Sequence, residues 1–312
     1  MNIIDILLER SQKRKTLKRT IDLGNMTSIT FKTDEDRQYH LEVGEMNSNI
    51  LSAGSPGRVR KIADYLKGSE IVEGDRGMTV VHGEFEGISV SAFPTGMGPS
   101  SASVVIPEAI EAAGDRLTLL RLGTAGSLQP DVNVGDIVVA EGAIRDEGTT
   151  SAVVGPEFPS IADPVMIPLI LGAAERKGYS LGEDLWSGII HVKDDLYFKE
   201  NPKVSPERDR LKRKMDSYRE MGALSSSMEF SVYTILRDYY QGEIKESITV
   251  GALLGIIGEI EERIEVDGEV KKSLEEDLIE IGLDVLLLTE RLRKGEGTDL
   301  EFEDILREHL LS

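Results

Sequence analysis

Residues 117–131 read LTLLRLGTAGSLQPD and carry one arginine, Arg121, inside an otherwise apolar run. Such a run predicts a buried strand over residues 117–122. A guanidinium in a buried strand is strongly destabilising unless an anion meets it. The strand is expected to break at residues 123–126, GTAG, where a glycine-bracketed turn offers backbone N–H groups and the Thr124 hydroxyl beside the same charge. These features indicate an oxyanion site, with phosphate as the expected anion.

Strands and helices alternate on both sides of this segment. Short apolar runs predict strands over residues 49–53, 79–81, 88–93, 117–122, 136–140, 188–192 and 250–257. Helical patterns fit residues 58–66, 100–113, 164–177, 229–240 and 274–293. This order is typical of the α/β class, and we expect three layers, α/β/α, around a mixed and largely parallel central sheet.

Composition divides the chain into three parts. Residues 1–38 are expected to form a helical, basic N-terminal extension, residues 39–293 one large domain, and residues 294–312 an acidic helical tail. Within the domain, residues 199–219 are polar enough to predict a mobile flap over an active site. No internal repeat is visible.

The charge balance and cysteine content exclude several classes of function. The 312 residues include 36 Lys and Arg against 56 Asp and Glu, a formal net charge of −20, which argues against nucleic acid as a partner. The sequence has no cysteine, no apolar run long enough for a membrane helix and no secretory signal pattern, so we expect a cytoplasmic location without membrane contact. A strongly acidic protein that binds an anion must gather its cations in one cleft; solubility alone is the other explanation of the acidity.

Two glycine-rich motifs follow predicted strands. Residues 53–58, AGSPGR, suit an anion held at a helix N-terminus with Arg58 reaching back to it, or equally a plain strand-to-helix turn with Pro56 near the first helical position. Residues 95–101, TGMGPSS, invite a dinucleotide-binding interpretation. That interpretation is weakened because Ser101 stands where the third glycine belongs.

Two later motifs also have a structural and a functional explanation. In residues 226–229, SSME, Ser226 and Glu229 fit a helix capping box, yet a carboxylate at such a position also suits two ribose hydroxyls. In residues 194–198, DDLYF, an aromatic ring fits against a flat base, although a Tyr-Phe pair also suits a core.

Taken in order, these segments resemble the nucleoside phosphorylase family that includes uridine phosphorylases and hexameric purine nucleoside phosphorylases. The resemblance spans about residues 39–292. It rests on residues 54–58 (GSPGR), 95–98 (TGMG), 121–126 (RLGTAG), 129–130 (QP) with 134–136 (VGD), 144–148 (IRDEG) and 228–229 (ME). Each motif is weak alone, and the shared order carries the assignment.

The resemblance implies phosphorolysis, in which inorganic phosphate attacks the anomeric carbon of a nucleoside and releases the base. It implies no metal and no cofactor, with phosphate as co-substrate. It also implies a homo-oligomer with active sites shared between two subunits, of which a hexamer built as a trimer of dimers is one form.

Site residues carry over by position. The phosphate-binding residues would be Gly54, Arg58, Arg121 and Thr124, with Arg76 lent by a neighbouring subunit. The ribose-binding residues would be Met228 and Glu229, with His40 lent by the neighbour. The base-binding residues would be Thr124, Gly126, Tyr197, Phe198 and Glu200. Arg121, Glu229 and Glu259 would act in catalysis.

The base pocket departs from the uridine-specific pattern. The glutamine and arginine that read uracil in that branch fall on Glu200 and Pro202, and proline has no side-chain donor. Glu259 falls near the acid that purine enzymes use, although it also suits a solvated charge among neighbouring glutamates. We therefore expect a phosphorylase of the uridine type, with a purine nucleoside phosphorylase, a hydrolytic nucleosidase and a non-catalytic nucleoside-binding protein as alternatives.

Overall fold

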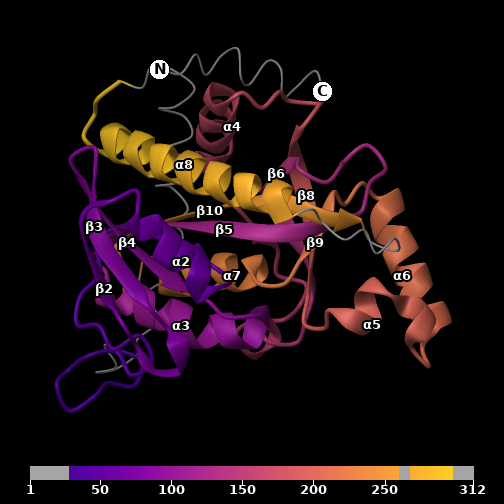
Figure 1. Ribbon diagram of the computed structural model, residues 1–312. Helices are drawn as coiled ribbons and strands as arrows, with labels where there is room; N and C mark the ends of the chain where they lie inside the picture. Colours follow the sequence, from indigo (N-terminus) through magenta and orange to yellow (C-terminus); the bar gives the residue numbers. More distant parts are fainter. Residues whose placement is uncertain (1–27, 243, 260–267, 298–312) are drawn as a thin grey trace.

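Strand β5 (Arg116–Ser127) runs through the centre of a ten-stranded mixed sheet in the computed structural model, which describes residues 28–242, 244–259 and 268–297 (Figure 1). The other strands are β1 (Asn49–Ala53), β2 (Lys67–Val72), β3 (Val80–Phe85), β4 (Ile88–Pro94), β6 (Ile137–Asp146), β7 (Ser160–Ile161), β8 (Leu185–Lys193), β9 (Ser225–Ser227) and β10 (Ser247–Glu259). The α-helices are α2 (Pro56–Ala63), α3 (Gly98–Ala112), α4 (Met166–Lys177), α5 (Tyr197–Glu200), α6 (Arg208–Glu220), α7 (Phe230–Tyr240) and α8 (Gly268–Arg293).

The sheet folds back on itself at one end. Its strand order is β10-β6-β8-β9-β5-β1-β4-β3-β2, with β7 paired to β6, and β10 also pairs with β5. Strand β10 is parallel to β5 and antiparallel to β6, so β5, β10, β6, β8 and β9 close a ring. The remaining strands form an open extension in which β1 lies between β5 and β4 and is parallel to both.

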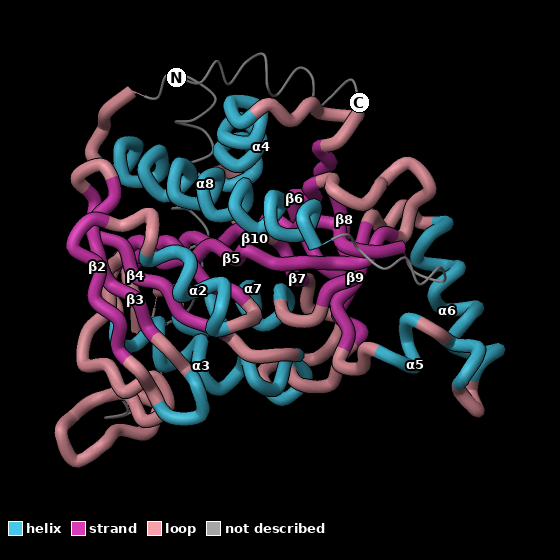
Figure 2. Tube along the Cα trace, in the orientation of Figure 1, coloured by secondary structure: helices cyan, strands magenta, loops and turns pink. Residues whose placement is uncertain are grey.

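Helices cover both faces of the sheet (Figure 2). On one face, α2, α4 and α8 bury apolar side chains such as Ile62, Leu169 and Leu278 against the strands. On the other face, α3 and α7 form a second core around residues such as Ile106 and Tyr233. The α/β class and the layered arrangement around a mixed sheet, expected from the sequence, are confirmed.

The predicted break in the chain after residue 122 is wrong. Residues 123–126 stay extended within β5 because β10 continues to pair with them, up to Ser127 opposite Glu259. Glycine serves close packing there rather than a turn: a Cβ on Gly123 would lie 2.3 Å from Leu254 Cδ2 and 3.2 Å from Arg121 Nε. The missing side chain lets the Arg121 guanidinium fold back along its own strand.

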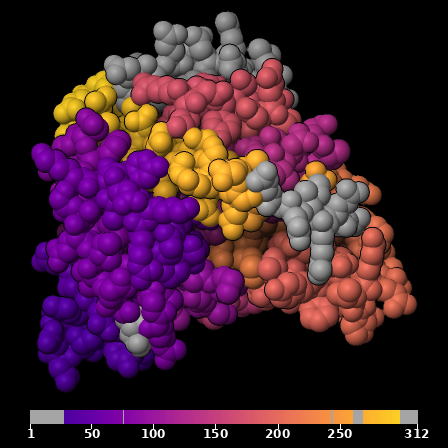
Figure 3. All heavy atoms as spheres, in the orientation of Figure 1, coloured from indigo at the N-terminus to yellow at the C-terminus, as the bar shows by residue number. Residues whose placement is uncertain are grey.

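Two further local predictions are corrected. Ser226 does not cap a helix, because it belongs to β9, where it pairs with Gly126 of β5 and His191 of β8. The predicted flap at residues 199–219 is mostly helical: α6 fills its second half and buries Leu211 and Met215. The α5–α6 segment projects from one side of the described part of the molecule (Figure 3).

Of the predicted N-terminal extension, only residues 28–38 are described, and they contact α3. The Thr30 hydroxyl donates to Glu111 at 2.6 Å, and Gln38 is fully buried. The predicted helix before them and most of the acidic tail lie outside the described residues. No helix among the described residues is long and apolar enough to cross a membrane.

Candidate active site

A cavity of about 540 Å³ opens at the carboxyl ends of β1, β5, β8 and β10. Ligands of open parallel sheets bind at this edge, because loops and helix N-termini gather there. The described lining holds four basic side chains, Arg58, Arg121, Lys193 and Lys271, and four acidic ones, Glu200, Glu229, Glu259 and Glu275. In a chain of 36 basic and 56 acidic residues, this balance is a local concentration of cations.

Arg58 lies at one end of the cavity and is held from three directions. Its helix α2 begins after Ser55, whose hydroxyl accepts from the Arg58 backbone N–H, and Pro56 takes the first helical position. The guanidinium donates to the Leu122 carbonyl at 3.1 Å and to Glu275 of α8 at 3.0 Å. The helix-start explanation of this motif is confirmed, and Arg58 also lines the cavity, where an anion site stays a prediction.

Arg121 lies on the central strand β5, lines the same cavity as Arg58 and is 3% exposed. It forms an ion pair with Glu229, and its guanidinium carbon lies 5.8 Å from the centre of the Tyr233 ring. Burial alone would lower the pKa of Arg121, but the Glu229 carboxylate and Tyr233 outweigh it and raise the pKa. Arg121 Nε, Arg121 Nη1 and Arg58 Nε are buried without a hydrogen-bond partner among the described residues.

Glu229 joins the arginines to the glycine-rich loop. One carboxylate oxygen pairs with Arg121, and the other accepts from the backbone N–H of Gly98 at 2.8 Å. Gly98 has φ +82°, a backbone conformation suited to glycine, and this turns its N–H toward the carboxylate. Glu229 precedes α7 without capping it by its side chain, so the predicted capping box is absent.

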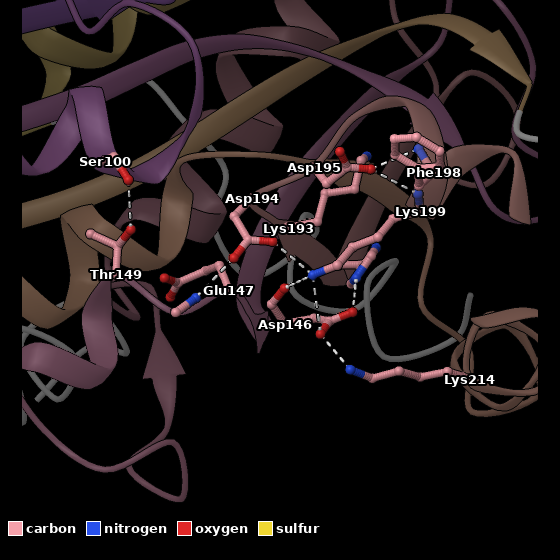
Figure 4. Close-up of polar contacts among 12 residues, drawn as sticks. Ser100, Asp146, Glu147, Thr149, Lys193, Asp194, Asp195, Phe198, Lys199 and Lys214 are labelled. Atoms are coloured by element: carbon pink, nitrogen blue, oxygen red, sulfur yellow. Dashed lines mark hydrogen bonds and ion pairs between the residues drawn. The ribbon is translucent and has the colours of Figure 1, made fainter. Parts of the chain in front are cut away.

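A second polar cluster lies around Asp146 (Figure 4), next to the cavity-lining Lys193. Asp146 accepts from His191 at 3.1 Å and pairs with Lys199 and Lys214. Burial alone would raise the pKa of Asp146, but hydrogen bonds from His191 and Lys214 and the charge of Lys199 outweigh it and lower the pKa. Burial also lowers the pKa of His191, which favours the neutral imidazole.

Lys193 lies between this cluster and the cavity. Its ammonium donates to the Ser226 hydroxyl at 2.5 Å and to Glu200 at 2.8 Å, and the residue is 1% exposed. Burial lowers the pKa of Lys193, and the Glu200 carboxylate opposes the shift.

The family is settled by comparison with known proteins. A family model described as the phosphorylase superfamily matches residues 50–236. The chain belongs to this superfamily.

Among similar proteins, a guanosine phosphorylase of Halorubrum lacusprofundi is 30% identical to this phosphorylase over 227 residues, covering 72% of this chain and 84% of that protein. A uridine phosphorylase of Treponema pallidum is 27% identical over 262 residues, covering 83% and 96% of the two chains. A DeoD-type purine nucleoside phosphorylase of Oceanobacillus iheyensis is 29% identical over 246 residues, covering 78% and 96%. These relatives are named nucleoside phosphorylases, which are pentosyltransferases, and the family inferred from the motifs is confirmed.

A solved structure shows the same fold. The crystal structure of a uridine phosphorylase from Vibrio fischeri, complexed with 6-hydroxy-1-naphthoic acid, superposes with a TM-score of 0.67 at 23% identity, covering 81% of this phosphorylase and 97% of that chain.

The structure brings together most of the residues predicted for the site. The cavity of the phosphorylase is lined by Gly54, Arg58, Arg121, Thr124, Gly126, Glu200, Met228, Glu229 and Glu259. Tyr197 and Phe198 are not in the lining; they are 70% and 49% exposed, because α5 turns them outward. His40 and Arg76 also lie outside the lining within one chain, and His40 is held by Glu108, whose carboxylate contacts the His40 Nδ1 at 2.7 Å.

Sequence reasoning missed Lys193, Leu196, Lys271 and Glu275 in the lining. Lys193 could have been found from the sequence. Residues 189–193, IIHVK, contain two ionisable side chains within an apolar strand, the same pattern that drew attention to Arg121. Glu275 carried none, since α8 is full of charges and only the packing of α8 on the sheet brings this one to Arg58. No group of three or more His, Asp or Glu suited to a metal ion occurs in the described part of the chain.

Proposed function

We propose that this chain is a nucleoside phosphorylase of the uridine phosphorylase type, which cleaves the N-glycosidic bond of a nucleoside with inorganic phosphate. The products are ribose 1-phosphate and the free base. A cysteine-free sequence supports a cytoplasmic setting for this reaction.

The observation that carries the proposal is the pair of arginines at one end of the cavity. Arg58 and Arg121 are 7% and 3% exposed, and both keep buried N–H groups without a partner among the described residues. Buried cationic donors are stable only when anionic acceptors satisfy them. Gly54 and Thr124 line the same end, and they suit the oxygens of a phosphate.

The chemistry follows from the charges along the cavity. As the bond between C1′ and the base nitrogen breaks, its electron pair leaves with the base, and the ribose becomes cation-like. A phosphate dianion held beside C1′ stabilises that cation and then forms the new C–O bond. Glu229, next to Arg121, accepts hydrogen bonds from the ribose hydroxyls, and Met228 lies under the sugar.

We propose that each site is completed by a second copy of the chain. His40 and Arg76 line no part of the cavity of their own chain, and the family pattern assigns them to a neighbour's ribose and phosphate. The Glu108 carboxylate accepts from the backbone N–H groups of His40 and Leu41 and holds the imidazole at Nδ1, which leaves Nε2 for a ligand. A homo-oligomer with shared sites follows, and a trimer of dimers is compatible with it.

A purine nucleoside is the second candidate substrate, because Glu259 at the end of β10 lines the cavity. An acid there suits protonation of a departing purine ring nitrogen.

Assays with and without phosphate test the proposal. The purified chain is incubated with uridine, inosine, guanosine and adenosine, and free base and ribose 1-phosphate are measured. We expect base release only with phosphate, in equal amounts with ribose 1-phosphate. Phosphate-independent release with free ribose would identify a nucleosidase, and no release from any nucleoside would favour a binding protein.

A further inference from the structure

The strand order sets an axis along the cavity. Neighbouring strands run β1, β5, β9, β8, and each contributes lining residues: Gly54 follows β1, Arg121 and Thr124 lie on β5, Ser226 on β9 and Lys193 on β8. With strands about 4.8 Å apart, three spacings measure about 14 Å, a length that suits a nucleoside with phosphate beside it. If phosphate occupies the arginine end, as the proposed function requires, the base lies at the Lys193 end.

Lys193 brings an amino group, ion-paired with Glu200, to that end. At 1% exposed, the ammonium has little contact with water, and its described partners are one hydroxyl and one carboxylate. Only Ser226 and Glu200 therefore decide where its remaining N–H donor points. A buried ammonium is costly unless its donors are used, so such a group indicates an additional acceptor.

A chain of hydrogen bonds fixes the direction in which Ser226 works. Asp146 is ionised and only accepts, so His191 Nε2–H donates to it at 3.1 Å. The neutral imidazole then accepts at Nδ1, and the Ser226 hydroxyl donates its proton there across 2.9 Å. Ser226 can then accept from Lys193, so the chain Asp146, His191, Ser226 holds the ammonium in place.

Glu200 completes a donor–acceptor pair beside the base. Its side chain is 31% exposed against 1% for Lys193, so the ammonium lies deeper and the carboxylate nearer the mouth of the cavity. An exocyclic group projects furthest from a base ring and therefore meets the deeper partner. An exocyclic oxygen accepts from an ammonium, whereas an exocyclic amino group would direct N–H against it.

We propose that Lys193 and Glu200 select an oxo base, with Lys193 donating to the exocyclic oxygen and Glu200 accepting from the adjacent ring N–H. Uracil, hypoxanthine and guanine carry this arrangement, while cytosine and adenine carry an amino group beside an unprotonated ring nitrogen. The pair also stabilises the negative charge that the oxygen gains as the base departs. This inference rests on the proposed function.

The test compares substrates in Lys193→Met, which keeps the length of the side chain without its charge. We expect kcat/KM for uridine and inosine to fall about 100-fold, as when an oxyanion donor is removed, with the KM for phosphate unchanged. Adenosine and cytidine, already poor substrates, should change little. 5-Fluorouridine, whose base leaves more readily, should lose only about tenfold, because it depends less on the ammonium.

Matched variants separate this role from a structural one. Lys212→Met removes a lysine of α6 that pairs with Asp216 and does not line the cavity, and it should keep the wild-type preference. Lys193→Arg keeps the charge and should keep the oxo preference. If the methionine variant does not fold, Lys193→Gln serves in its place.

Calorimetric binding of uracil, hypoxanthine, adenine and cytosine, with phosphate present, distinguishes this inference from the proposed function. Tight binding of the two oxo bases that weakens at least tenfold in Lys193→Met supports the inference, even if no nucleoside is cleaved. Equal losses for all four nucleosides, unchanged binding, absence of binding, or a wild-type preference for adenine or cytosine would overturn it, while phosphate-dependent cleavage would still stand.

Discussion

At the scale of single residues, the two arginines of the cavity are both paired with carboxylates. Arg58 donates to Glu275, and Arg121 pairs with Glu229. Burial alone would raise the pKa of Glu275, but Lys61 and Arg58 outweigh it and lower the pKa. Replacing Arg121 would leave Glu229 buried without a counter-charge. This should lower the free energy of unfolding by about 3–5 kcal/mol. Arg58 is therefore the better position for testing phosphate binding.

Arg58→Met should raise the KM for phosphate about 10- to 100-fold, because charge-assisted hydrogen bonds contribute about 1.5–3 kcal/mol each. The KM for the nucleoside should change much less. Arg60→Met is the matched control: Arg60 lies on the same helix, pairs with Glu73 and does not line the cavity. Initial rates over a range of phosphate concentrations decide the matter, and equal effects of the two substitutions would contradict the assignment.

Asp146 links stability to pH. Its folded pKa lies below the ordinary carboxyl value, so its contribution is complete above that value and is lost as the pH falls toward the folded pKa. Asp146→Asn should lower the free energy of unfolding by about 2 kcal/mol at neutral pH. The difference from wild type should shrink from about pH 5 downward.

Urea unfolding of both proteins across this pH range measures the effect. Asp216→Asn, which breaks an exposed pair with Lys212, is the control and should alter stability by less than about 1 kcal/mol. A loss for Asp146→Asn that stays constant as the pH falls would show that the carboxylate charge is not the cause.

At the scale of elements, the loop between β4 and α3, residues 95–97, lines the cavity and contains a glycine with a positive φ. Gly96 has φ +69°, and a Cβ there would lie 2.3 Å from the hydroxyl oxygen of Ser101, which donates to the Thr95 carbonyl. Gly87, in the turn between β3 and β4, has φ +83° with no atom within 4 Å of such a Cβ. The two glycines share the backbone conformation and differ in free space.

Gly87→Ala should therefore lower stability by about 1 kcal/mol, the cost of a left-handed conformation. Gly96→Ala should lower it by about 2–5 kcal/mol, since strain and overpacking add. The double variant Gly96→Ala, Ser101→Ala should recover part of the excess. Thermal or urea unfolding of the four proteins provides the comparison, and equal losses at the two glycines would mean that the Ser101 contact has no effect.

Elements with clear hydrophobic spacing could be predicted from the sequence. Strand β1 covers the predicted residues 49–53, and α3, α4 and α7 lie close to their predicted ranges. Helix α6 was taken for a flap because it is mostly charged, although Leu211, Met215 and Tyr218 have helical spacing. Strand β9 could not be predicted, because three serines have no strand pattern and gain their partners only from β5 and β8.

At the scale of the whole molecule, the proposed sharing of sites predicts complementation between two impaired variants when they are assayed at low phosphate concentration. Arg58→Met damages the site of its own chain, while Arg76→Ala damages the neighbour's site. A mixed dimer of the two variants holds one intact site out of two. Because random mixing makes about half of all dimers mixed, about a quarter of wild-type activity should be restored.

The control mixes Arg58→Met with Glu229→Gln, which both act in their own chain, and should restore nothing. Activity of each mixture is measured after the subunits have been unfolded and refolded together. A mixture of Arg58→Met and Arg76→Ala with no more activity than its components would place Arg76 outside the partner's site.

The sequence by itself determined the fold class and the family and predicted the two arginines that line the cavity, because Arg121 in an apolar strand and the ordered glycine motifs are local signals. Only the tertiary structure decided what those charges meet. The pairing of Arg121 with Glu229, of Arg58 with Glu275 and of Lys193 with Ser226 joins segments far apart in the chain. Such contacts depend on the register of strands and the docking of helices, which local residue patterns do not encode.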